Sequence, residues 1–182
     1  MKYSKYCYWM LVGFPVLVSC AVAPKLSTLT IPSVNNVDIN RYAGNWFEIA
    51  RLPQSFEKGL VNVTATYEIR PDGKISVINQ GYKGSAAGKP SKAKGTAWIP
   101  DPKSPGVLKV RFFWPFTGVY KIINLDLKEY TYSVVTSNSK KYLWILSREP
   151  VMNDKTYKEL VEFTRQNGFD VDKLIKVPQN WR

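Results

Sequence analysis

Hydrophobic and polar residues alternate with a period of two through most of the chain between Trp46 and Leu146. Successive side chains of a strand point to opposite faces, so this alternation predicts half-buried β-strands. Turn-forming residues separate the segments, as the run Pro71-Asp72-Gly73 does. The expected strands cover residues 45–52, 61–70, 74–82, 92–99, 106–113, 118–126, 130–137 and 142–148. Eight strands joined by short hairpins predict an all-β fold, an antiparallel up-and-down barrel, although spacing alone also allows a sandwich.

The pattern changes after the last of these strands. Between Asp154 and Asn167, apolar residues recur at helical spacing, which predicts one amphipathic helix packed on the barrel wall. Asn153 or Asp154 can cap its first turn, and Gly168 can end it. A short ninth strand is expected near residues 174–177.

The first twenty residues predict processing rather than folding. Lys2 and Lys5 precede an apolar stretch, residues 8–18, that is shorter than the roughly 20 residues a membrane-spanning helix needs. The run Leu17-Val18-Ser19-Cys20 then resembles the bacterial lipobox, whose Cys receives diacylglycerol and an acylated amine after cleavage. We therefore expect a lipoprotein signal peptide over residues 1–19, lipid attachment at Cys20 and a tether over residues 20–37. Ala21, in place of an Asp, favours the outer membrane, with the protein facing the periplasm.

Charge and composition narrow the choice of partners. The net charge of +12 favours anionic partners, but Lys and Arg are scattered rather than gathered in a stripe, so we expect a membrane and no nucleic acid. The chain has no His, and its two Cys, Cys7 and Cys20, precede the expected barrel. These absences exclude His-based catalytic triads and Cys-rich zinc sites. We expect no catalytic residue, metal or cofactor.

Two segments resemble the lipocalin family. Residues 42–51 are similar to its first-strand motif, G-x-W followed by an aromatic residue, and residues 142–148 to its last strand with a closing Arg. A middle block around Leu125-Asp126 and Tyr132 keeps the family pattern only in part. Segments at 63–67, 77–82 and 168–171 are similar to the bacterial outer-membrane branch, whose relatives include apolipoprotein D.

The resemblance implies an eight-stranded lipocalin barrel with a C-terminal helix over residues 38–182. In this family Gly44 would allow the tight turn into the first strand, Trp46 would close the narrow end, and Arg148 would lie over its indole ring. These three residues are expected to be structural.

Alternation divides the strands into an inner and an outer face. Inward Trp46 implies inward Glu48 and Ala50, and a carboxylate inside a barrel must be hydrogen-bonded, paired or protonated. We expect Glu48 to be a structural partner, with contact to a ligand amine as the alternative. Small inward residues beside aromatic ones favour a cavity over a filled core. The residues expected to contact a ligand are Ala65, Tyr67, Val77, Asn79, Ala97, Val110, Phe112, Tyr120, Ile122, Asn124, Tyr142 and Trp144.

The leading functional interpretation is non-catalytic binding of a fatty acid, lysophospholipid or similar lipid, with its head near Lys83, Lys89 and Lys92 at the rim. The resemblance implies a role in lipid storage or transport during envelope maintenance. Two alternatives stay open, a lipid-modifying enzyme on the same fold and a structural envelope lipoprotein that binds nothing. A homodimer is also left open.

Overall fold

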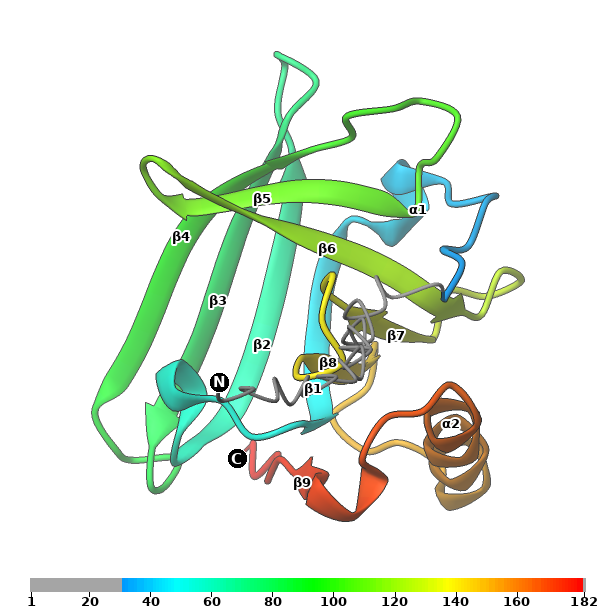
Figure 1. Cartoon of the computed structure of the whole chain (residues 1–182). Coiled ribbons are helices and arrows are strands. Elements are labelled where there is room, and N and C mark those ends of the chain that lie inside the picture. The colour runs from blue at the N-terminus through cyan, green and yellow to red at the C-terminus, as the bar shows by residue number, and fades with distance from the viewer. Residues whose placement is uncertain (1–30, 182) are drawn as a thin grey trace, which may run out of the picture.

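The computed structural model describes residues 31–181, which form one closed barrel with a helix on its wall (Figure 1). The sheet order is β2-β3-β4-β5-β6-β7-β8-β1-β9, and β1 also pairs with β2, which closes the barrel. The strands are β1 Gly44–Arg51, β2 Leu60–Ile69, β3 Ile75–Lys83, β4 Pro90–Trp98, β5 Val107–Phe113, β6 Phe116–Leu125, β7 Tyr132–Thr136, β8 Leu143–Ser147 and β9 Ile175–Lys176. The helices are α1 Ile39–Tyr42, α2 Asp154–Gln166 and the 3-10 turns η1 Ser55–Glu57 and η2 Val171–Lys173.

All barrel pairs are antiparallel, so the eight-stranded up-and-down barrel is confirmed and the sandwich is excluded. The connections that contain η1, residues 84–89 and residues 114–115 lie at one end of the barrel, here called the mouth. The opposite, narrow end is closed by α1. Asp38 caps α1, its carboxylate accepting the backbone N–H of Asn40 at 2.9 Å.

Register shifts interrupt four of the strand pairings, and those in β1 and β6 change which residues point inward from what the sequence predicts. In β1 the register with β8 shifts between Glu48 and Ala50, so Ile49 and Ala50 both face the helix side. The prediction that Ala50 points inward is therefore wrong, because the extra residue reverses the alternation and Arg51 becomes the next inward side chain. In β6 the register with β7 shifts between Ile122 and Asn124.

The sheet separates two hydrophobic cores. One fills the narrow part of the barrel around Trp46, Tyr42 and Ile122, which are almost fully buried. The other lies between the barrel wall and α2, where Leu160 and Phe169 pack against the strands. Asn153 caps α2 by accepting the backbone N–H of Lys155 at 2.9 Å, as the sequence predicted.

The C-terminal segment covers a gap in the barrel wall. β1 and β2 pair only from Gly44 to Phe47. Further along β1, at Ala50 and Arg51, β9 pairs with it instead. Gln179 then bridges the two strands, because its Nε2 donates to the carbonyl oxygens of Glu48 at 2.8 Å and Val63 at 3.0 Å. The expected ninth strand is thus present.

Residues 31–37, assigned above to the tether, lie against the barrel. Ile31 and Val37 are buried, and the backbone N–H of Val34 donates to the carbonyl of Ile122 at 2.9 Å. These seven residues therefore belong to the barrel rather than to a free tether. The expected signal peptide, residues 1–19, and Cys20 lie outside the described residues. Among residues 31–181, no helix has the length and apolar character needed to cross a bilayer.

Candidate ligand-binding cavity

A cavity of about 660 Å³ fills the half of the barrel next to the mouth. Its walls are mostly apolar, with aliphatic and aromatic side chains from strands β2 to β8. Small residues on β2 and β4, namely Ala65, Ala93 and Ala97, leave the space that larger side chains would fill. The cavity lies within the range of about 300–1,000 Å³ usual for small-molecule sites.

The structure brings most of the expected ligand-contacting residues to this cavity. Those that line it are Ala65, Tyr67, Val77, Asn79, Ala97, Val110, Phe112, Tyr120 and Trp144. Period-two alternation was sufficient to find them because none of these positions follows the bulges in β1 and β6 within its strand.

The other three expected residues, Ile122, Asn124 and Tyr142, do not line the cavity. Ile122 faces inward but is fully buried in the core below the cavity floor. Asn124 follows the β6 bulge, and Leu125 instead joins the inner core. Tyr142 precedes the start of β8 and is 37% exposed, with its ring stacked on Trp144 at a centroid distance of 6.2 Å.

Three tyrosines meet at the cavity floor. The hydroxyls of Tyr42 and Tyr120 are 2.6 Å apart, and the Tyr67 hydroxyl donates to that of Tyr120 at 3.1 Å. Tyr42 also donates to Ser133 Oγ at 3.3 Å. Burial raises the pKa of Tyr42 to about 12 and raises the pKa of Tyr67 further, so these groups stay neutral. The network satisfies its own hydroxyl groups and gives the floor a polar but uncharged surface.

Two carboxylates share one guanidinium on the wall near the mouth. Arg51 Nη1 donates to Glu48 Oε1 at 2.6 Å, and Arg51 Nε lies 3.9 Å from Glu57 Oε2. Trp144 Nε1 donates to the same Glu57 oxygen at 3.1 Å. Burial raises the pKa of Glu48 to about 8, helped by the neighbouring Glu57, and burial raises the pKa of Glu57 as well.

This cluster corrects the sequence analysis in part. Of the states expected for a buried Glu48, the structure shows an ion pair with Arg51, which lies near the mouth. Glu57 was missed as a second carboxylate on the cavity wall. It comes from η1 in the β1–β2 connection, where no periodic pattern indicates which way a side chain points.

The rim lysines lie away from the cavity. Lys83, Lys89 and Lys92 are exposed near the mouth, and none of them lines the cavity. On β4 the neighbours of Lys92, Ser91 and Ala93, face the cavity instead, so the lysine projects from the outer face.

Trp46 and Arg148 close the narrow end in the expected arrangement. The Arg148 guanidinium lies 3.9 Å from the centre of the fully buried Trp46 ring. It also donates to the carbonyl oxygens of Asn45 at 2.7 Å and Arg41 at 2.8 Å. Gly44 has a φ of +98°, and a Cβ there would lie 3.2 Å from Arg148 Nη1, so both the backbone and the space favour glycine.

Comparison with known proteins agrees with this geometry. The Lipocalin-like domain family matches residues 37–179. This chain belongs to the lipocalin family. It is 42% identical to the outer membrane lipoprotein Blc of Escherichia coli K12 over 90% of each chain, and 32% identical to bovine apolipoprotein D over 81% of this chain and 80% of that one. The cockroach allergen Per a 4 has the same fold, with a TM-score of 0.63 and 23% identity over 81% of this chain and 91% of that one.

Metal binding finds no support in residues 31–181, where no three His, Cys, Asp or Glu side chains gather into a ligand set. The cavity combines apolar walls, a neutral tyrosine floor and one buried carboxylate–guanidinium cluster.

Proposed function

We propose that this protein is a lipid-anchored lipocalin that holds one fatty acid, lysophospholipid or similar amphiphile in its barrel. The observation that carries the proposal is the apolar cavity of about 660 Å³ that opens at the mouth. An alkyl tail would lie along Ala65, Val77 and Val110, where it would lose its contact with water. The head would stay at the mouth, where it keeps its hydration.

One polar atom inside supports an amphiphile over a plain hydrocarbon. The side-chain oxygen of Asn79 is buried and accepts no hydrogen bond from the described residues. Burying an acceptor without a hydrogen bond destabilises the protein. A ligand hydroxyl that donates to the Asn79 oxygen would offset this free-energy cost.

Anchoring at Cys20 is the second part of the proposal. It is supported by the lipobox-like run that ends at Cys20 and by relatives that are named outer membrane lipoproteins. Several acyl chains on one residue give stable attachment, since each buried CH₂ adds about 0.8 kcal/mol. In this arrangement the barrel faces the periplasm next to a lipid supply and stores or transports lipids for envelope maintenance.

Catalysis is the weaker alternative. Glu48 and Glu57 are the paired carboxylates that an enzyme without His would need, but Arg51 and Trp144 already occupy their oxygens. A lipid turned over by the purified protein would favour the enzyme, whereas saturable binding without turnover favours the carrier.

The proposal is tested by filling the cavity. Ala65→Trp places an indole inside it, so we expect the affinity for a fluorescent fatty acid to fall by about tenfold or more. Thr66→Trp is the matched control, because Thr66 does not line the cavity and its hydroxyl bonds to Asn45 on the outer face. Equal affinities of the two variants, each folded by circular dichroism, would refute the cavity as the binding site. Native mass spectrometry of protein purified from membranes would identify a bound lipid and the modification of Cys20.

A further inference from the structure

The hairpin between β5 and β6 carries three large aromatic side chains into solvent. Phe113, Trp114 and Phe116 are 74%, 82% and 77% exposed, and Phe113 pairs with Phe116 across the hairpin. Single exposed apolar residues are common, but a contiguous aromatic patch on a monomer marks a surface that meets another apolar phase. We call residues 113–116 the aromatic tip.

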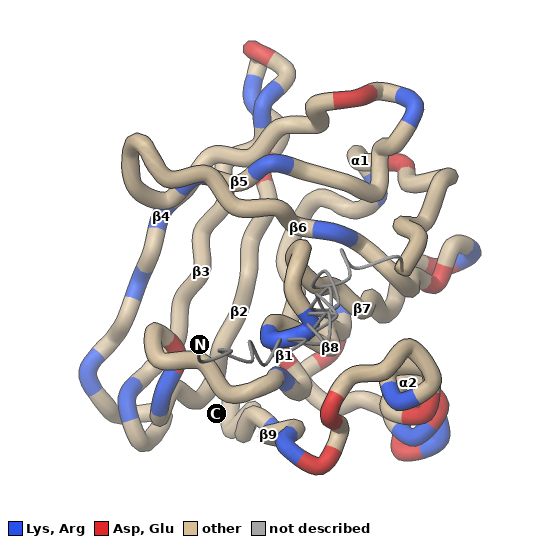
Figure 2. Tube along the Cα trace, viewed as in Figure 1, with Lys and Arg blue, Asp and Glu red and all other residues tan. Residues whose placement is uncertain are grey.

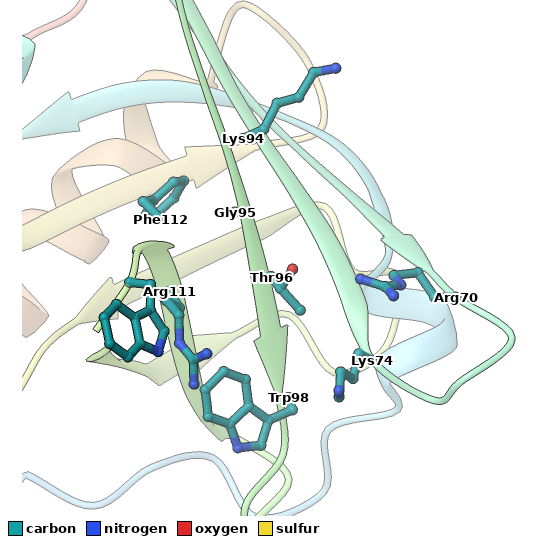
Figure 3. A pocket seen from close by; sticks show the side chains of 9 residues that line it. Arg70, Lys74, Lys94, Gly95, Thr96, Trp98, Arg111 and Phe112 are labelled. Carbon is teal, nitrogen blue, oxygen red and sulfur yellow. The ribbon is translucent and has the colours of Figure 1, made fainter. Parts of the chain in front are cut away.

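The aromatic tip adjoins a cationic groove on the outer wall of the barrel. This groove, of about 540 Å³, is lined by Arg70, Lys74, Lys94, Trp98, Arg111 and Trp114 (Figure 3). Trp114 thus belongs both to the tip and to the groove. Gly95 lets β5 approach β4 closely beside the groove, because a Cβ there would lie 2.8 Å from the Phe112 ring and 2.9 Å from the Arg111 carbonyl oxygen.

The charges of the groove are only partly balanced. Asp72 accepts from Arg70 at 2.9 Å and lies 4.0 Å from Lys74. Within residues 31–181, Lys94 and Arg111 form no ion pair, and the Arg111 guanidinium lies over the Trp98 ring at 5.3 Å. The groove therefore has a net positive charge beside flat aromatic surfaces.

The positive charge of the groove continues over the half of the barrel formed by β3 to β6. Strands β3 to β6 contain no Asp or Glu, and Figure 2 shows blue without red along them. Their basic residues are Lys83, Lys92, Lys94, Lys109, Arg111 and Lys121. A bilayer rich in anionic phospholipids presents the complementary charge and accepts aromatic rings in its headgroup region.

We propose that this half of the barrel docks on an anionic phospholipid bilayer independently of Cys20, with the aromatic tip in the headgroup region and the cationic groove against lipid phosphates. Phe113 and Phe116 also line the inner cavity, so docking brings the cavity opening to the lipid surface. β4 pairs with β5 only from Thr96 to Trp98, which leaves the hairpin free to project from the wall. In this proposal the acyl anchor at Cys20 keeps the barrel close to the membrane, and this face determines how the barrel is oriented on it.

Vesicle binding tests the proposal with a chain that begins at Ala21. This chain lacks Cys20 but keeps residues 31–181, which form the described barrel. We expect it to sediment with vesicles of phosphatidylcholine and phosphatidylglycerol more than with phosphatidylcholine alone, and less as salt is added. Trp114→Ser should lower the partition coefficient by about tenfold, and Lys94→Gln and Arg111→Gln by about fivefold each.

Matched controls lie on the far side of the molecule. Val151→Ser removes an apolar side chain that is 78% exposed, and Lys155→Gln and Lys158→Gln remove exposed charges from α2. These variants should bind vesicles like the parent chain. Fatty-acid affinity measured without vesicles should be unchanged in Trp114→Ser, because Trp114 does not line the cavity.

Several results would overturn the inference. These are no binding to anionic vesicles, equal binding by Trp114→Ser and Val151→Ser, or binding that salt does not weaken. A dimer that Trp114→Ser dissociates would show that the tip instead contacts a second copy. Vesicle binding without fatty-acid binding would sustain this inference and reject the proposed function.

Discussion

Arg148, just after the last barrel strand, joins α1 and the start of β1 at the barrel floor. Its guanidinium covers the Trp46 ring and donates to backbone carbonyls around α1, including those of Arg41 and Ala43. A planar guanidinium can stack on the ring and donate to several carbonyls at once, whereas a Lys ammonium group cannot reproduce this arrangement of N–H donors.

Arg148→Lys should therefore lower the free energy of unfolding by about 2 kcal/mol, from lost charged hydrogen bonds and a weaker contact with the ring. Urea unfolding followed by circular dichroism measures this. Arg165→Lys on the exposed face of α2 is the control and should cost less than about 0.5 kcal/mol. Similar costs for both variants would contradict the role given to Arg148.

Glu48 links stability to pH. Its pKa is raised from 4.5 to about 8 by burial, so the folded state binds a proton that the unfolded state has released between these pH values. The free energy of unfolding should then fall as pH rises through this range.

Glu48→Gln removes the titrating group, so between pH 5 and pH 8 its free energy of unfolding should fall by up to about 3–4 kcal/mol less than that of the parent chain. Urea unfolding at a series of pH values gives the two slopes. Glu68→Gln, at an exposed position on β2, should keep the parent slope. Equal slopes in Glu48→Gln and the parent chain would show that the buried carboxylate is ionised throughout.

At the scale of elements, the two faces of the barrel wall have different neighbours, a helix outside and the cavity inside. α2 packs on the outer face through Leu160, which is 3% exposed, while the cavity lies on the inner face. In Figure 1, α2 lies outside the barrel beside β7, β8 and β1. Packing of α2 should therefore contribute to stability without shaping the ligand site.

Leu160→Ala should destabilise the barrel by about 2–4 kcal/mol, because it leaves a void between helix and sheet. The affinity for a fluorescent fatty acid should stay within about twofold of the parent value, since Leu160 does not line the cavity. Thermal unfolding and fluorescence titration measure the two effects. Glu159→Ala, exposed on the same helix, is the control, and a loss of affinity in Leu160→Ala would show that the outer core shapes the cavity.

At the scale of the whole molecule, charge is distributed unevenly around the barrel. Between Gly73 and Leu125 the chain has nine Lys or Arg and one acidic residue, Asp101, whereas the other thirteen Asp and Glu lie outside this span. Opposite charges would screen each other if they alternated around the barrel. Their separation leaves one half basic, which gives the molecule a preferred orientation towards an anionic surface.

The sequence by itself determined the strands, the helix and the closing pair of Trp46 with Arg148. A strand turns its side chains by a fixed half-turn per residue, so nine cavity positions could be found from alternation alone. The helix and its Asn153 cap follow from equally local rules.

Only the tertiary structure decided the positions that local periodicity does not reach. One extra residue in a bulge reverses the faces of everything after it, which moved Ala50 and Asn124 out of the barrel interior. Glu57 reaches the cavity from a connection without any period, and its place depends on Arg51 and Trp144 across the wall. Such contacts join distant parts of the chain, so their geometry is set by closure of the barrel and not by neighbouring residues.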